Sequence, residues 1–194
     1  NDAPFVEMLT EENTRKAVRD QLSLNTDFIK IWYIVTDADV EKGARKNLAL
    51  VQAAIDEAHK NNKRVAVHAT ERITAQLAVE AGADYLVHSV DDEVVSDAFV
   101  QLLKQKKTIL CPTLVVMGNY GKVLGDHYHF NTDELNLANP ETIGSVLDYP
   151  WPDTTTAKMY IKSMSSAIQA AREITGDSIM TVNLRKLVSG GVII

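Results

Sequence analysis

RVAVHATERITAQLAVEAGADYLVH, residues 64–88, contains two short apolar runs on either side of one helical segment. The runs 64–68 and 84–88 have the length of strands and are largely apolar, which is typical of parallel strands buried on both faces. Residues 71–81 have helical periodicity and end at Gly82, a residue suited to the left-handed position that follows a helix. The stretch therefore predicts a β–α–β unit with parallel strands.

The same alternation continues in both directions along the chain. Before this unit, the pattern predicts a helix from Thr10 to about Leu24, a strand over 28–33 and a helix over 45–60. After it come a helical stripe over 95–103, a strand within 108–116, a long helix that includes 161–174, a helix over 180–189 and a strand that begins at Val192. Four strands and the beginning of a fifth fit part of a β/α barrel or a doubly wound sheet equally well.

Composition and charge narrow the classes of function. The 194 residues carry a formal net charge of −6 without clusters of Lys and Arg, which argues against nucleic acid as a partner. No apolar run approaches the roughly 18 residues of a membrane-spanning helix, so no membrane partner is expected. The single cysteine, Cys111, excludes a cysteine-based zinc site, and we interpret it as an inert packing residue.

Three polar residues lie in or at the ends of otherwise apolar strands: Lys30, His68 and His88. Parallel strands of a barrel bring their carboxyl ends together, and two histidines presented there can share a metal ion. Each residue also has a structural interpretation, because a single strand-end histidine is commonly just hydrogen-bonded and Lys30 can pair with Asp27. The three together favour a metal site. No Gly-X-Gly-X-X-Gly motif or phosphate loop supports the doubly wound alternative.

Several short segments carry a resemblance to a known family over nearly the whole chain. The sequence resembles the amidohydrolase superfamily, in the branch of imidazolonepropionase-like enzymes and metal-dependent Xaa-Pro dipeptidases. The segments occur in the family's order: DFIKIW at 27–32, EAHK at 57–60, VAVHA at 65–69, LVHS at 86–89, CPTL at 111–114 and NLRKLVSGGVI at 183–193.

The resemblance implies a partial TIM-type (β/α)₈ barrel with strands four to seven and the start of strand eight. Lys30 falls at the strand-four lysine that many relatives carboxylate as a bridge between two metal ions. His68 and His88 fall at the histidines ending strands five and six, which are ligands of the second metal, and His59 is expected to be structural. The implied cofactor is a divalent metal, zinc first, as one or two ions. The implied reaction is hydrolysis of a C–N bond in a dipeptide or cyclic amide by metal-activated water.

Two essential parts of the family's site are not among these residues. The strand-one His-X-His pair is expected before Asn1, and the strand-eight aspartate, which is the general base, is expected beyond Ile194. A whole barrel usually needs about 250 residues, so we interpret the chain as a fragment, inactive by itself. Its native start is then missing, and a cytoplasmic location is favoured over a secreted or periplasmic one.

Residues 117–153 interrupt the β/α pattern and are rich in Gly, Asn, Asp, Pro and aromatic residues. We interpret them as a loop insertion in a single domain, 1–194, with Tyr120 a candidate substrate contact and a plain surface loop the alternative. His127-Tyr128-His129 is expected to be a solvated part of this loop.

A non-catalytic alternative treats the chain as a scaffold whose open strand edges favour a homo-oligomer. It predicts that Phe28, Ile31, Val65 and Val67 are partly exposed unless a partner covers them.

Overall fold

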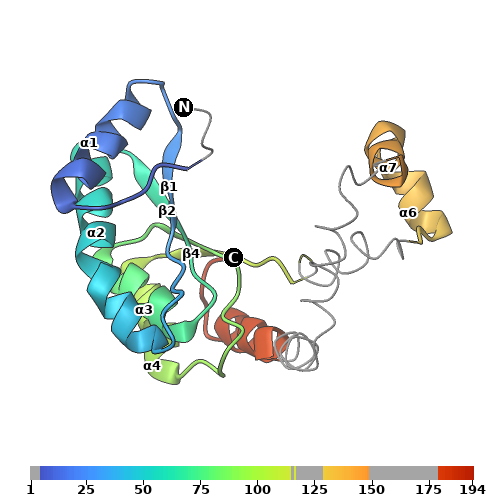
Figure 1. The fold of residues 1–194 in the computed structure, drawn as a ribbon. Helices are drawn as coiled ribbons and strands as arrows, with labels where there is room; N and C mark the ends of the chain where they lie inside the picture. Colours follow the sequence, from blue (N-terminus) through green and yellow to red (C-terminus); the bar gives the residue numbers. More distant parts are fainter. Residues whose placement is uncertain (1–4, 115, 117–128, 149–178) are drawn as a thin grey trace. The chain divides into compact units, whose positions relative to one another are not determined.

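The computed structural model describes residues 5–114, 116, 129–148 and 179–194. The chain divides into two compact units, which we describe separately: Asn1–Leu114 with Gly176–Ile194, and Val115–Thr175 (Figure 1). No helix in the described ranges is long and apolar enough to cross a membrane.

The first unit is built on a four-stranded parallel sheet. Its strands are β1 (Phe28–Trp32), β2 (Arg64–His68), β3 (Tyr85–Val87) and β4 (Ile109–Cys111), in the order β1-β2-β3-β4. The α/β class and the parallel strands predicted from the sequence are confirmed. Each crossover moves the chain on by one strand without a reversal of order, which is consistent with part of a β/α barrel.

Helices α1 (Glu11–Leu22), α2 (Val40–Lys60), α3 (Arg72–Ala81) and α4 (Asp97–Lys106) alternate with these strands (Figure 1). Local chemistry sets their ends: Thr10 accepts a hydrogen bond from the Asn13 N–H at the start of α1, and Gly82 ends α3 at φ 106°. The helix expected over 45–60 begins at Val40 instead, because Asp39 accepts from the Lys42 N–H and forms an earlier cap.

The expected partial exposure of four strand residues is correct only for Phe28. Phe28 is 51% exposed, whereas Ile31 is 3% exposed and Val65 and Val67 are fully buried. Alternation along the strands explains the difference, because Phe28 and Ile31 point to opposite faces of β1. Helices cover one face of the sheet, here called the outer face, and Ile31, Val65 and Val67 lie on it. The opposite face, here called the inner face, carries none of the helices α1 to α4.

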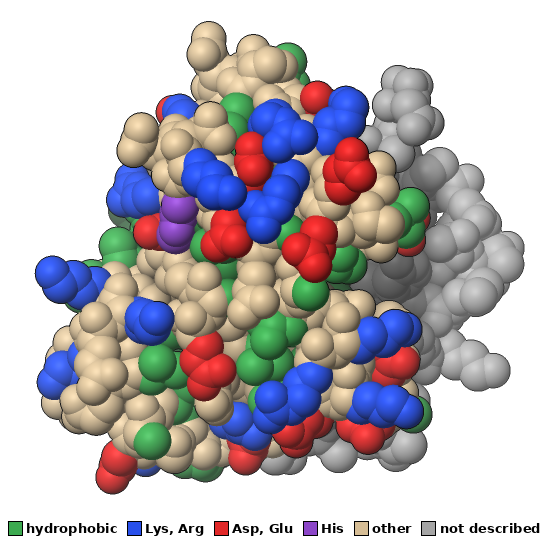
Figure 2. Space-filling model, turned by 90° about the vertical axis from the view of Figure 1, so that its left-hand side faces the viewer, with side chains coloured by type: hydrophobic (Ala, Val, Ile, Leu, Met, Phe, Trp, Pro, Cys, Tyr) green, Lys and Arg blue, Asp and Glu red, His purple; other side chains and the backbone are tan. Residues whose placement is uncertain are grey.

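Ion pairs tie α1 to α2 on the outside of the molecule. Arg15 contacts Asp56, and Arg19 donates a hydrogen bond of 2.9 Å to Glu57. Figure 2 shows this helical side, where Lys and Arg side chains are interleaved with Asp and Glu. The mixture of both signs marks a charged helical surface rather than a single basic or acidic patch.

The C-terminal residues return to the sheet. Residues 179–189 are helical, which confirms the helix expected over 180–189. The strand expected from Val192 is not formed, but the Leu110 N–H of β4 donates to the Ile193 carbonyl at 2.9 Å. The last residues of the chain therefore lie beside β4.

The second unit contains two short helices, α6 (Thr132–Leu137) and α7 (Pro140–Leu147), in the stretch expected to be a loop. Asn131 and Glu134 form a reciprocal capping box at α6, and Asn139 caps α7 with Pro140 in its first turn. Tyr120, His127-Tyr128 and the long helix expected to include 161–174 lie outside the described residues.

Candidate metal centre

The candidate site lies on the inner face of the sheet. Partners in parallel register point to the same face, so the pairing aligns side chains in rows across the strands. One row holds Trp32, His68, Val87 and Cys111, and the next row holds Lys30, Ala66, Tyr85 and Ile109. Two of the three predicted metal ligands, Lys30 and His68, therefore stand on one face in adjacent rows.

His88 follows β3 directly and joins them. Its ring contacts the ring of His68 edge-on, with centroids 4.4 Å apart and an interplanar angle of 74°. Two histidine nitrogens on one tetrahedral zinc ion stand about 3.3 Å apart, given Zn–N bonds of about 2.0–2.1 Å. Imidazole rings at this spacing can provide two ligands to one ion.

Both histidines are held in the form that binds metal. Burial lowers the pKa of His88 to about 4, and the nearby His68 and Lys30 add to the effect. Burial also lowers the pKa of His68, with a further contribution from Lys30. Neutral imidazole, not imidazolium, ligates a metal, so the pair is ready for metal at neutral pH.

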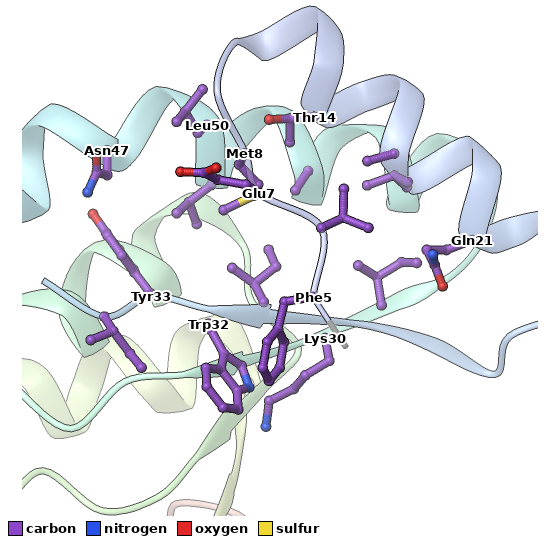
Figure 3. A pocket seen from close by; sticks show the side chains of 18 of the residues that line it. Phe5, Glu7, Met8, Thr14, Gln21, Lys30, Trp32, Tyr33, Asn47 and Leu50 are labelled. Atoms are coloured by element: carbon purple, nitrogen blue, oxygen red, sulfur yellow. The ribbon is translucent and has the colours of Figure 1, made fainter. Parts of the chain in front are cut away.

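The surroundings of Lys30 shift its side chain toward the neutral amine. Partial burial lowers the pKa of its ammonium group, and only the opposing influence of Cys111 raises it. In Figure 3 the Lys30 side chain points to the side of β1 away from α1 and α2, as does Trp32. A lowered pKa increases the fraction of lysine present as neutral amine, and this is the form that reacts with carbon dioxide to give a carbamate.

Thr113 holds the far side of His88 and was not found from the sequence. The Thr113 hydroxyl lies 2.5 Å from His88 Nδ1, and the His88 N–H donates to the Cys111 carbonyl at 3.0 Å. His88 itself has φ 80°, in the left-handed region that is uncommon for residues other than glycine. The one sequence feature that could have pointed to this contact is the position of Thr113 in the CPTL segment, which begins at the end of β4, the strand next to His88.

Aromatic residues border the site along β1, and these too were missed. The Trp32 ring lies 5.6 Å from the His68 ring, and Phe5 stacks on Trp32 at 4.2 Å between centroids. A cavity of about 820 Å³ runs along this edge of β1, lined by Phe5, Trp32 and Lys30 together with residues of α1 and α2 (Figure 3). Trp32 therefore links the cavity to the histidine pair.

The remaining candidates from the sequence lie elsewhere or behave differently. Cys111 is exposed on the inner face rather than packed, because its register with Val87 turns it away from the helices. His59 pairs with Asp84 at 2.8 Å, and His129 is exposed in the second unit. Within the described ranges, no three His, Cys, Asp or Glu side chains form a metal-binding group, so His68 and His88 need Lys30 or further ligands.

Comparison with known proteins bears on the fold. No protein-family model and no curated protein matches the sequence. Among solved structures, the chain is similar to a protein of Bifidobacterium longum provisionally assigned as a prolidase, with TM-score 0.61 and 21% identity over 99% of this chain and 40% of that one. It is also similar to a Xaa-Pro dipeptidase with bound methionine, with TM-score 0.56 and 17% identity over 100% of this chain and 40% of that one. A third similar structure is the A. niger ochratoxinase, with TM-score 0.61 and 15% identity over 98% of this chain and 34% of that one.

The chain therefore shares part of the fold of these three solved structures. It spans no more than 40% of the length of these three structures. At these identities the similarity concerns the fold alone.

Proposed function

We propose that the chain supplies part of the metal site of a hydrolase that cleaves C–N bonds in small amides or dipeptides. One observation carries the proposal. His68 and His88, at the ends of adjacent parallel strands, meet as a pair of neutral imidazoles, with the amine of Lys30 close enough to lower both pKa values. The fold neighbours, which include a Xaa-Pro dipeptidase, support the same chemical class.

Each residue has a defined task in this proposal. His68 and His88 would hold the ion through neutral ring nitrogens, and Lys30, once carboxylated, would add an anionic oxygen ligand from the neighbouring strand. A divalent ion held there would supply an activated water at neutral pH and would polarise the scissile carbonyl. Trp32 and Phe5 form an apolar wall beside His68, which suits the uncharged part of a dipeptide or cyclic amide.

The donor set fits zinc in kind but is incomplete by itself. Two imidazoles and one carbamate would give three protein ligands, and the family resemblance adds the strand-one His-X-His pair and the strand-eight aspartate. By that resemblance the aspartate would be the general base for the bound water. Little or no hydrolysis is therefore expected from these residues alone, and metal binding is the property to test first.

The test is metal content, measured by mass spectrometry after loading the protein with zinc and removing excess ion. Wild-type protein is expected to retain zinc, and the double variant His68→Ala, His88→Ala is expected to lose it. His129→Ala is the matched control, because His129 is an exposed histidine of the second unit. Equal zinc in the wild type and the double variant, or none in the wild type, would overturn the proposal.

A further inference from the structure

We infer that Thr113 is a positioning residue whose hydroxyl fixes His88 as the Nδ1–H tautomer and leaves Nε2 free for a metal ion. This inference rests on the proposed function and deepens it. Thr113 touches neither the ion nor a substrate in this scheme, and it acts only through the imidazole of His88.

The geometry gives His88 three separate restraints. The backbone N–H of His88 donates to the Cys111 carbonyl, Nδ1 contacts the Thr113 hydroxyl, and the ring edge meets His68. The first two restraints come from the end of β4 and the residues that follow it. This segment, Cys111 to Thr113, therefore fixes both the backbone and the ring of His88.

The backbone of His88 explains why such restraint is needed. A φ of 80° places this residue, which directly follows β3, in a sparsely populated backbone region. The N–H bond to Cys111 holds that conformation, and the contact with Thr113 then selects one rotation of the ring. Without the hydroxyl, the ring can turn about its Cβ–Cγ bond and take either nitrogen away from the site.

The Thr113 hydroxyl can accept a hydrogen bond from Nδ1 or donate one to it, and a metal-binding role for Nε2 requires that it accept. A neutral imidazole carries one proton, and a metal takes the nitrogen that lacks it. When Nδ1 donates its proton to the Thr113 oxygen, Nε2 keeps its lone pair. The opposite assignment places a proton on Nε2 and blocks the ligand position. Ligating histidines generally donate their other N–H to a nearby oxygen in this manner.

Two substitutions separate the hydroxyl from the shape of the side chain. Thr113→Val keeps the branched form and removes the oxygen, whereas Thr113→Ser keeps the oxygen and removes a methyl group. Thr70→Val makes the same chemical change in the loop after β2, close to His68 but not bonded to His88, and serves as the matched control.

The primary readout is the tautomer of His88 in the metal-free protein at neutral pH, from long-range ¹H–¹⁵N spectra with His88→Gln to assign the signals. The wild type, Thr113→Ser and Thr70→Val are expected to show the Nδ1–H form. Thr113→Val is expected to lose this preference. Zinc affinity, measured by calorimetry, is expected to fall about 10- to 100-fold in Thr113→Val and to be retained in Thr113→Ser.

The outcomes distinguish this inference from the function on which it rests. An Nε2–H tautomer in the wild type, or an unchanged Nδ1–H preference in Thr113→Val, would overturn the role of Thr113 even if zinc binds normally. An Nδ1–H tautomer that depends on the hydroxyl supports the role of Thr113 even if the wild type binds no zinc. That last result would overturn the proposed function alone.

Discussion

Asn183 is the buried polar side chain that holds the loop after His88. It is 1% exposed, its amide donates to the Val90 and Glu93 carbonyls at 3.1 and 2.9 Å, and its oxygen accepts from the Val95 N–H at 2.9 Å. Asn183→Ala leaves three backbone groups without this partner, so we expect a loss of about 1–3 kcal/mol in the free energy of unfolding. Asn183→Asp keeps the oxygen that accepts from Val95, but it places a carboxylate against the Val90 and Glu93 carbonyls. We expect it to lower the free energy of unfolding at least as much as Asn183→Ala.

Denaturant unfolding measures both changes. Asn61→Ala is the control, because the Asn61 amide makes one hydrogen bond, of 2.8 Å, to the Glu57 carbonyl at the end of α2. That variant is expected to cost less than about 1 kcal/mol. If Asn183→Ala destabilised the protein no more than the control does, the hydrogen bonds of Asn183 would not be what holds this loop.

Single residues show where prediction from the sequence succeeds and where it fails. Lys30, His68 and His88 could be proposed together because strand ends in consecutive β/α units converge, and the structure brings the two histidines into ring contact. Thr113 and Asn183 could not be assigned roles, because their partners lie 25 and about 90 residues away in the chain. Such bonds depend on how loops meet in space, which local patterns do not encode.

At the scale of elements, the contact of α1 with α2 depends on a buried carboxylate. Glu57 is 8% exposed and accepts a hydrogen bond from Arg19, which is the main reason that its pKa is lowered. Because the folded pKa lies below the unfolded one, the stabilisation is fully present above the unfolded pKa and is lost as the pH falls through the folded pKa. Glu57→Gln is expected to lose about 1–2 kcal/mol at pH 7, with a smaller difference in acid.

The measurement is thermal or denaturant unfolding of both proteins from neutral to acid pH. Glu41→Gln provides the control, since Glu41 pairs with Arg45 on α2 where both side chains are more than half exposed. Exposed pairs of this kind contribute less than about 0.5 kcal/mol. A Glu57→Gln difference that stayed constant down to acid pH would contradict the assignment of this stability to the charge of Glu57.

Elements were predicted well where their pattern is long or their ends carry a clear cap. The strand over 64–68 and the helix ended by Gly82 match closely, because apolar runs and a glycine stop are local signals. The start of α2 was missed because Gly43 and the polar residues around it hide the helical stripe. Helices α6 and α7 are six and eight residues long, too short for their periodicity to stand out from a loop.

At the scale of the whole molecule, the sequence pattern predicted the parallel strands but not which strand residues lie on the inner face or at the free edge of β1. The barrel interpretation correctly anticipated parallel strands in an order without reversal. Which strand residues are exposed was misjudged, because a count of apolar residues does not say which face the helices cover. The register settles this by placing Phe28, Lys30 and Trp32 on one side and Ile29 and Ile31 on the other.

The exposed edge of β1 predicts self-association. Among the described residues β1 pairs only with β2, and Phe5, Trp32 and Ile34 beside its free edge are about half exposed. Unpaired backbone groups next to apolar side chains favour pairing with another chain. Sedimentation over a wide range of concentration is therefore expected to show dimers or larger species.

Ile34→Lys should shift these species toward monomer by placing a charge at the free edge of β1, whereas Leu137→Lys, at an exposed leucine of α6, should not. A monomer at every concentration would exclude the self-associating scaffold and leave the metal site as the function to pursue.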